Sequence, residues 1–470
     1  MPSNRKFTCF LSIFLLLSTF AFGQGRGAIF DEQYDNLPRR AELSRGSYEG
    51  LPAAYSLKQF APLPGDQADY GTCVAWAAAY GARTISESIA LNRLNQTETT
   101  KNAFSPVYIY RNIKPDDHEC VEGTQIYSAL DYMRDTGTVK MLDVERTVSF
   151  PRVNLAYYRT VRNYPIADYV TLFSSDHKKK STMITRIVKK SISEGKPVII
   201  GMNTPDSFSV ATEVWRPTEN PGRFYYGHAL CVIGYDDSKY GGAFELLNSW
   251  GRKWGNGGYI WIPYQTFVDF VLEGYEIIEN IASLTGTLKF DGFVRLEVKA
   301  HNVPETRTAS LSLNKDGNYT TTETFSEGTQ ARFIIGSKES AYVYSFMVSK
   351  PQGSGNFYSP VLLFPSAGVS PLLNYSDSAV IVPAENKTIT LDSSGAAYVI
   401  TLYSKHALNI THVMHNFTSA SGTINKRLAS ALGDGYTTSL VHSVNEAAFT
   451  LTAENSREVA ALVVEIGTAE

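Results

Sequence analysis

Tryptophan and cysteine are confined to one part of this 470-residue chain, and this unevenness is the strongest single constraint on its fold. All five tryptophans lie between Trp76 and Trp261, and after residue 23 the three cysteines lie between Cys73 and Cys231. Neither residue type occurs after Trp261. A chain of this length is expected to form two or three domains. We therefore predict a domain boundary just after residue 280, with the reactive side chains before it.

The first residues carry the pattern of a secretory signal peptide. Arg5 and Lys6 precede an apolar run from Phe7 to Phe22, and we predict cleavage near Gln24, which removes residues 1–23. The run is shorter than the ~20 apolar residues of a membrane-spanning helix, so an uncleaved anchor is the weaker alternative. No later segment is long and apolar enough to span a membrane. We therefore expect a secreted or periplasmic protein of bacterial origin.

Charge and composition exclude several classes of protein. With 43% apolar and 19% charged residues, the chain is globular rather than collagen-like, coiled-coil or wholly disordered. Its formal net charge of -3 offers no general attraction to nucleic acid or anionic lipid. Three cysteines remain after signal cleavage, and this odd number in an exported chain indicates intermolecular pairing or a reactive thiol.

Segments before residue 280 show helical patterns first and strand patterns later. A cleft between the helical half and the β half is the expected place for chemistry. Thr72 is a candidate N-cap of the first helix. The predicted helices are 72–94, 123–133 and 181–193, and the predicted strands are 197–202, 229–235, 244–248 and 259–262.

Beyond residue 283 the chain becomes a series of short apolar runs separated by turn residues, which is typical of a β-sandwich or a related β domain. We predict a short pro or linker segment at 24–50, a first domain at 51–280 and this β-rich accessory domain at 285–470. One predicted helix, 421–432, interrupts the accessory domain. Its five histidines lack metal-ligand spacing, so we expect no metal site. The apolar runs are 343–348, 361–364, 379–382, 398–403 and 459–466, and the predicted turns are Asp291-Gly292, Asp316-Gly317 and 353–355.

Cys73 lies where a glycine-containing turn meets the start of the first predicted helix, in the sequence Gln67-Ala-Asp-Tyr-Gly-Thr-Cys73. The unpaired N–H groups and the dipole of a helix N-terminus favour the thiolate, which is the nucleophilic form of cysteine. A buried structural cysteine is the more common explanation of a lone cysteine. Position alone therefore does not assign catalysis to Cys73.

Two further motifs supply partners for such a thiolate. His228 opens an apolar strand, and an imidazole beside Cys73 could form a thiolate–imidazolium pair and then protonate a leaving group. Asn248-Ser-Trp250-Gly lies on the next predicted strand, where the amide can hold one ring nitrogen of His228 and the indole can shield that bond from water. Taken singly, His228 could equally be structural. The three side chains converge if the two halves pack together.

These motifs resemble those of the papain-like cysteine peptidases, over about residues 51 to 278. They are Gln-x5-Cys at a helix start, His-Ala before a Gly-Tyr strand, and Asn-Ser-Trp-Gly-x2-Trp-Gly-x-x-Gly-Tyr. The resemblance implies an α+β fold with a helical lobe and an antiparallel β lobe. It implies that Cys73 is the nucleophile, His228 the general acid and base, and Asn248 the orienting amide. Gln67 and the backbone N–H of Cys73 would form the oxyanion hole, and Trp250 would be a supporting residue that shields the bond between His228 and Asn248.

The sequence also departs from the family pattern. Tyr70 stands where relatives usually have a cysteine that bridges to the position of Cys120, so that disulfide should be missing. Val74 replaces the aromatic residue that commonly follows the nucleophile, and Gly227 replaces the acidic or polar residue often found before the histidine. Residues 24–50 are too few for the long helical inhibitory propeptide of lysosomal-type relatives. Any latency must come from this stretch or from the C-terminal domain.

The reaction implied by the resemblance is hydrolysis of peptide bonds through a thioester on Cys73, with peptides or proteins as substrates and no cofactor. The main alternative is a catalytically silent papain-fold protein that binds a partner through its cleft or its β domain. Another Cys-His acyl transferase, such as a transglutaminase or a cell-wall amidase, shares the chemistry but lacks the Asn-Ser-Trp-Gly block. The side-chain preference and the partner of the accessory domain are not predictable from the sequence.

Overall fold

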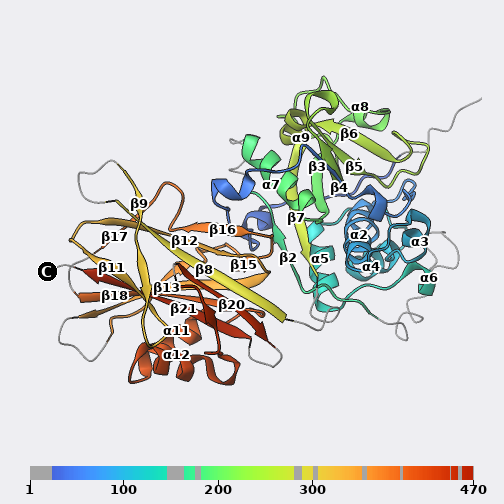
Figure 1. Ribbon diagram of the computed structural model, residues 1–470. Helices are drawn as coiled ribbons and strands as arrows, with labels where there is room; N and C mark the ends of the chain where they lie inside the picture. The colour runs from blue at the N-terminus through green and yellow to red at the C-terminus, as the bar shows by residue number, and fades with distance from the viewer. Residues whose placement is uncertain are drawn as a thin grey trace, which may run out of the picture.

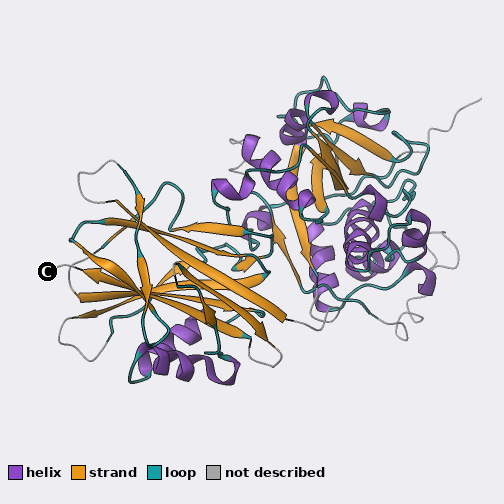
Figure 2. Ribbon diagram, viewed as in Figure 1, coloured by secondary structure: helices purple, strands orange, loops and turns teal. Residues whose placement is uncertain are grey.

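The chain folds into two bodies with separate hydrophobic cores, as the computed structural model shows in Figures 1 and 2. The N-terminal body mixes helices and strands, and the C-terminal body is made mostly of strands. The predicted signal peptide at 1–23 and the predicted boundary at 280–285 lie outside the described residues. The structure describes residues 24–144, 163–174, 181–279, 288–299, 305–351, 357–391, 395–444, 446–453 and 458–468.

The helical lobe of the N-terminal body begins at Cys73. Its first helix is continuous from α1 (Cys73–Ala75) through the π-helical η4 (Trp76–Arg83) to α2 (Thr84–Ala90), and its many alanines let it lie inside the core. Thr72 is at the N-cap position but its side chain makes no capping hydrogen bond. The helix ends at Ala90 rather than at residue 94, because Asn92 adopts a positive φ of 50° that stops it. The other helices are α3 (Gln96–Lys101), α4 (Pro106–Ile113), α5 (Ile126–Asp135) and α6 (Met141–Val144).

The β lobe is an antiparallel sheet in the order β2-β7-β3-β4-β5-β6, with β1 added to β4. Strands β3, β5 and β6 are buried at every position, because helices of the first lobe pack on β4 from one side and α7 packs on β3 and β4 as well. The four predicted strands are found within two residues of their ends. The elements are β1 (Ala54–Ser56), β2 (Asp168–Thr171), α7 (Ser181–Ser193), β3 (Val198–Asn203), α8 (Asp206–Ser209), β4 (Gly227–Asp236), β5 (Ala243–Leu247), β6 (Tyr259–Pro263), α9 (Tyr264–Phe270) and β7 (Val271–Ile278).

The C-terminal body has two sheets that share one apolar core. One sheet has the order β10-β11-β21-β18-β13-β14 and the other β16-β12-β8-β20-β19. The described strands are β8 (Leu288–Lys299), β9 (Arg307–Thr308), β10 (Leu311–Leu313), β11 (Tyr319–Phe325), β12 (Gln330–Ser337), β13 (Ala341–Pro351), β14 (Val361–Phe364), β15 (Leu372–Leu373), β16 (Ser378–Val382), β17 (Ile389–Thr390), β18 (Gly395–Ser404), β19 (Val441–His442), β20 (Ala447–Ala453) and β21 (Val459–Thr468). All five predicted apolar runs lie in strands. The β-rich character predicted for this part is therefore confirmed.

Two details of the C-terminal body differ from the prediction. Two helices are present rather than one, α11 (Ile410–Ser419) and α12 (Ile424–Leu432), and they pack on the outer face of β13, β18 and β21. Asp291-Gly292 is not a turn but lies inside β8, where a Cβ on Gly292 would come within 2.5 Å of the Tyr403 ring. The glycine is needed there for close packing. The predicted turn at 353–355 lies outside the described residues.

Residues 24–49, which we call the strap, run along both bodies before the chain enters β1; their dark blue trace passes between the bodies in Figure 1. Arg40 donates its backbone N–H to Thr171 of the N-terminal body at 2.8 Å. The carbonyl of Arg39 accepts from Ser370 of the C-terminal body at 2.7 Å. The Arg40 side chain forms a buried ion pair with Glu276, which also accepts hydrogen bonds from the Asn374 and Tyr375 side chains. The strap is therefore fixed to both bodies.

Candidate active site

Cys73 is at the N-terminus of α1, and its side chain faces the sheet rather than solvent. It is 0% exposed, and its thiol lies against the backbone of Ala229 in β4 and of Gly27 in the strap. Because Ala229 follows His228 directly, the fold brings the predicted nucleophile and the predicted base to the same junction between the lobes.

His228, Asn248 and Trp250 form a compact group at this junction. His228 Nε2 lies 2.8 Å from Oδ1 of Asn248, and the Trp250 indole stacks on the imidazole with ring centroids 4.5 Å apart and planes inclined by 23°. The other ring nitrogen, Nδ1, is buried and has no hydrogen-bond partner in the described parts of the chain. The amide thus fixes the ring and leaves one nitrogen unused.

Gln67 is the predicted side-chain donor of the oxyanion hole, and Ser249 fixes its orientation. The Gln67 backbone N–H donates to the carbonyl of Ser249 at 2.7 Å, and the Ser249 hydroxyl donates to Oε1 of Gln67. This leaves Nε2 to donate to the carbonyl oxygens of Tyr70 at 2.7 Å and of Gly25 at 3.1 Å. The Gly25 oxygen also accepts from the Trp250 indole N–H at 2.9 Å.

The strap fills the space above Cys73. Gly25 donates its N–H to Ala68 at 2.8 Å, Thr124 donates to the carbonyl of Gly27 at 2.8 Å, and Ala28 donates to the carbonyl of Gly227 at 3.1 Å. The approach is so close that a Cβ on Gly27 would lie 2.2 Å from the carbonyl oxygen of Gly71. The glycine before His228 has the same explanation, because a Cβ on Gly227 would lie 1.9 Å from the carbonyl oxygen of Ala28.

Residues 65–273 match the family model described as papain family cysteine protease. The chain contains a papain-family cysteine protease domain. Over 253 residues it is 28% identical to an uncharacterized peptidase C1-like protein of Acanthamoeba polyphaga mimivirus, covering 50% of this chain and 73% of the viral protein. The match to the family model confirms the predicted papain-like family and the predicted enzyme class, a cysteine peptidase.

Two solved structures are also similar to this chain, and by name they are a cysteine protease and a procathepsin. Xylellain, a cysteine protease from Xylella fastidiosa, shares 21% identity and covers 55% of this chain and 96% of its own, with a TM-score of 0.42. The digestive procathepsin L 3 of the Tenebrio molitor larval midgut shares 17% identity and covers 55% of this chain and 76% of its own, with a TM-score of 0.41.

Burial beneath the strap keeps the two reactive groups of the papain-family domain neutral. Burial raises the pKa of the Cys73 thiol to about 11, although hydrogen bonds from the backbone of Ala229 and Gly27 oppose the shift. Burial also lowers the pKa of His228 to about 3; the bond to Asn248 opposes this, and the positive charge of Arg26 adds to it. The sequence argument predicted a thiolate, but here the loss of solvent outweighs the helix N-terminus.

Two strap side chains, one before and one after Gly27, pack against the papain-family domain. The Phe30 ring covers Gly201 and Gly227, where added Cβ atoms would lie 2.4 Å and 3.0 Å from it. On the other side of Gly27, the Arg26 guanidinium lies over the ring of Trp250 at 5.6 Å. The strap therefore packs against the papain-family domain both before and after Gly27, whose backbone meets the Cys73 thiol.

One contributor to the site, Ser249, was missed from sequence, and one contact of the predicted Trp250 was not foreseen. Ser249 orients Gln67, and the Trp250 N–H points at the same oxygen as Gln67 Nε2, whereas only a shielding role was predicted for this indole. Both lie in the Asn-Ser-Trp-Gly block, so the motif was informative beyond its asparagine. Cys120 is buried and free, as expected from Tyr70 at the usual bridging position.

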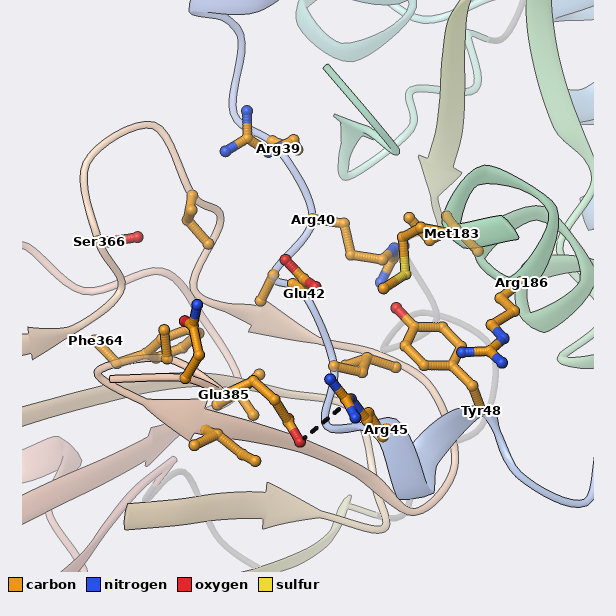
Figure 3. Close-up of a pocket in the computed structure, with 18 of the residues that line it drawn as sticks. Arg39, Arg40, Glu42, Arg45, Tyr48, Met183, Arg186, Phe364, Ser366 and Glu385 are labelled. Carbon is orange, nitrogen blue, oxygen red and sulfur yellow. Dashed lines mark ion pairs between the residues drawn. The ribbon is translucent and has the colours of Figure 1, made fainter. Parts of the chain in front are cut away.

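A cavity of about 710 Å³ lies away from the papain-family cleft, where the strap meets the C-terminal body (Figure 3). Arg39, Arg186 and Tyr48 line it, and Arg45 forms an ion pair with Glu385 at 3.8 Å across one side. None of the predicted site residues lines this cavity.

Within the described ranges, histidine, cysteine, aspartate and glutamate side chains nowhere form a group of three or more that could hold a metal ion. Among the same residues, every helix is too short or too polar to cross a membrane.

Proposed function

We propose that this chain is an exported cysteine peptidase that cleaves peptide bonds through a Cys-His-Asn thioester mechanism. The observation that carries the proposal is the 2.8 Å contact between His228 Nε2 and Asn248, which leaves Nδ1 unpartnered among the described residues at the junction with Cys73. An imidazole held in this way can take the thiol proton and return it to a leaving group.

The reaction begins when Cys73 transfers its proton to His228 and the thiolate attacks the peptide carbonyl. The resulting oxyanion accepts hydrogen bonds from Gln67 Nε2 and the Cys73 backbone N–H. The carbon–nitrogen bond then breaks as imidazolium protonates the departing amine, which leaves a thioester on Cys73. Water, deprotonated by His228, attacks this thioester. The carbon–sulfur bond then breaks, which releases the carboxylic acid product, and the Cys73 sulfur recovers its proton from His228. Asn248 holds the ring orientation throughout.

The Gly25 carbonyl supports the proposed position of the oxyanion. It is a neutral peptide oxygen that accepts from Gln67 Nε2 and the Trp250 indole, so it stands in for the charged oxygen of the tetrahedral intermediate. The strap thus blocks the position that a substrate carbonyl must take. We infer that the folded chain with its strap in place is a latent form and that displacement of the strap from the cleft starts activity.

Export is part of the proposal. Its support is the sequence at Arg5, Lys6 and Phe7–Phe22, because basic residues before a short apolar run are typical of a signal peptide. Secretion from a bacterial host, followed by mass measurement of the released chain, tests this proposal. A mature N-terminus near Gln24 supports export, and retention of residues 1–23 contradicts it.

A thiol-directed peptidyl epoxide tests the catalytic part. The variant Gly27→Val must displace the strap, because its Cβ would clash with the Gly71 backbone. We expect covalent labelling of Gly27→Val, its loss in Gly27→Val/Cys73→Ala, and its retention in the matched control Gly27→Val/Cys231→Ala, since Cys231 is a buried cysteine outside the catalytic group.

The outcome also separates the alternatives. A folded Gly27→Val chain that is never labelled would be the silent papain-fold binding protein rather than a peptidase. Labelling without peptide cleavage, together with release of products from cell-wall fragments, would indicate a different Cys-His acyl transferase. Peptide cleavage that disappears with Cys73→Ala supports the proposed hydrolysis.

A further inference from the structure

The Arg26 side chain of the strap lies in a site built by other segments. Its guanidinium carbon is 4.6 Å from the centre of the Tyr226 ring and 5.6 Å from that of Trp250. One terminal nitrogen donates to the Ser209 hydroxyl, and the other is 3.6 Å from the Asp206 carboxylate. The Arg26 side chain is only 12% exposed, so it is inserted rather than lying on the surface.

The chemistry of this site suits a planar cation. Two aromatic faces attract a guanidinium through their π electrons. The Ser209 hydroxyl and the exposed Asp206 carboxylate face its two terminal nitrogens, while the buried Nε has no partner among the described residues. Asp206 and Ser209 come from α8, Tyr226 precedes β4, and Trp250 follows β5. The site therefore belongs to the papain-family domain and persists when the strap leaves.

The position of the site relates it to the cleaved bond. Arg26 lies between Gly25, whose carbonyl meets Gln67, and Gly27, whose backbone meets the Cys73 thiol. The site shares Trp250 with the His228 imidazole, on which that indole stacks. Because the imidazole must protonate the departing amine, the amine half of a substrate lies on the His228 side.

We propose that Asp206, Ser209, Tyr226 and Trp250 form a subsite for an arginine side chain on the amine side of the cleaved peptide bond. This rests on the proposed peptidase function, and it assigns a substrate class: peptides with a basic residue just after the cleaved bond. Arg26 is then the occupant that holds the strap in this subsite.

Binding without catalysis is the first test. The probe is the synthetic peptide Gln-Gly-Arg-Gly-Ala-Ile-Phe, which copies residues 24–30, and its counterpart with norleucine in place of arginine. On the Gly27→Val/Cys73→Ala chain we expect the arginine peptide to bind about tenfold more tightly. In an added Asp206→Lys variant this ratio should fall to about one, because the new cation repels the guanidinium, whereas Asp269→Lys on α9 should leave it at about ten. Equal affinity of the two peptides, or a ratio that Asp206→Lys does not change, overturns the subsite.

Cleavage is the second test, and it fixes the side of the bond. Two internally quenched peptides that differ only in arginine or norleucine after the cleaved bond are given to Gly27→Val, and mass spectrometry locates the cut. We expect about tenfold higher kcat/KM for arginine. Equal rates, or preference for arginine only before the cut, overturn the assignment while leaving the peptidase intact. Failure of epoxide labelling instead removes the peptidase function, and the peptide affinities then decide the subsite alone.

Discussion

The wall of the cleft and the strap that fills it are held in different ways. The wall residue His228 lies in β4, which pairs with β3 on one side and with β5 on the other. Near the thiol the strap belongs to no described strand: it is held by backbone bonds from Gly25, Ala28 and Ile29 and to Gly27, and by side-chain bonds to the Gly25 carbonyl. Segments held outside a sheet open at lower free energy than central strands. The molecule therefore combines a rigid catalytic wall with a cover that can be lost separately.

The largest effect should come from breaking the wall at Gln67. In the Gly27→Val background, Gln67→Ala should lower kcat by ~10²- to 10³-fold with little change in KM, because it removes one oxyanion donor. Steady-state kinetics with a quenched peptide measures this. The control Gln265→Ala removes a glutamine of α9 that bonds only Asp269 in the described structure, and it should leave kcat unchanged.

In the chain whose strap is in place, the same substitution should increase the reactivity of Cys73. Gln67 also holds the Gly25 carbonyl, so Gln67→Ala in an otherwise unaltered chain should loosen the strap. Alkylation of Cys73 by iodoacetamide, followed by mass mapping, should become faster in that variant although catalysis becomes slower. A parallel fall in both rates would mean that Gln67 does not hold the strap.

Displacing the cover should give the next largest effect. Gly27→Val should speed epoxide labelling of Cys73 at neutral pH by about 10- to 100-fold, since the strap loses two or more hydrogen bonds worth about 0.5 to 1.5 kcal/mol each. The matched control is Gly46→Val in the same strap, where a Cβ would meet nothing within 4 Å.

The comparison fails if the two glycine variants behave alike. Equal labelling of Gly27→Val and Gly46→Val, with both chains folded by circular dichroism, would show that the strap does not control access to Cys73. Rapid labelling of the unaltered chain would have the same meaning.

The wall was predictable from sequence because its residues are tied to strong local patterns. The strand that carries His228 is a long apolar run, and Cys73 follows a glycine turn at the start of an alanine-rich helix. Such patterns determine the lobe to which each residue belongs and the face of its helix or strand on which it lies. The site then forms when the two lobes pack together. The family resemblance supplied the roles, which the structure leaves as predictions for Cys73, His228, Asn248 and Gln67.

The cover was not predictable, because its contacts are between distant backbone groups. Gly25 and Gly27 look like ordinary linker glycines, and nothing near them in sequence indicates that they touch Tyr70 and Gly71. Gly292 was predicted to lie in a turn for the same reason. In the sequence, a glycine that leaves room for the Tyr403 ring looks like a glycine that forms a turn. Glycines required by long-range packing carry no local pattern.

A change of pH should have the smallest of the predicted effects on the opening of the strap. Burial lowers the pKa of His228 to about 3, and opening of the strap is expected to move it back to the ordinary value of 6.5. Between these values the open form binds a proton that the closed form does not, so a fall in pH favours opening. From pH 6.5 to 5.5 the open population should rise by about fivefold.

The measurement is the ratio of iodoacetamide alkylation rates at Cys73 in the unaltered chain and in Gly27→Val, since this ratio cancels the pH dependence of the thiol itself. It should rise about fivefold over this interval. In a His228→Gln pair of the same chains the ratio should stay constant, because the group that gains the proton is gone. The charge of Arg26 also faces His228, but it does not titrate here and cannot produce the change. A ratio that does not change with pH when His228 is present would mean that opening of the strap does not expose the imidazole. The strap would then control solvent access to Cys73 only.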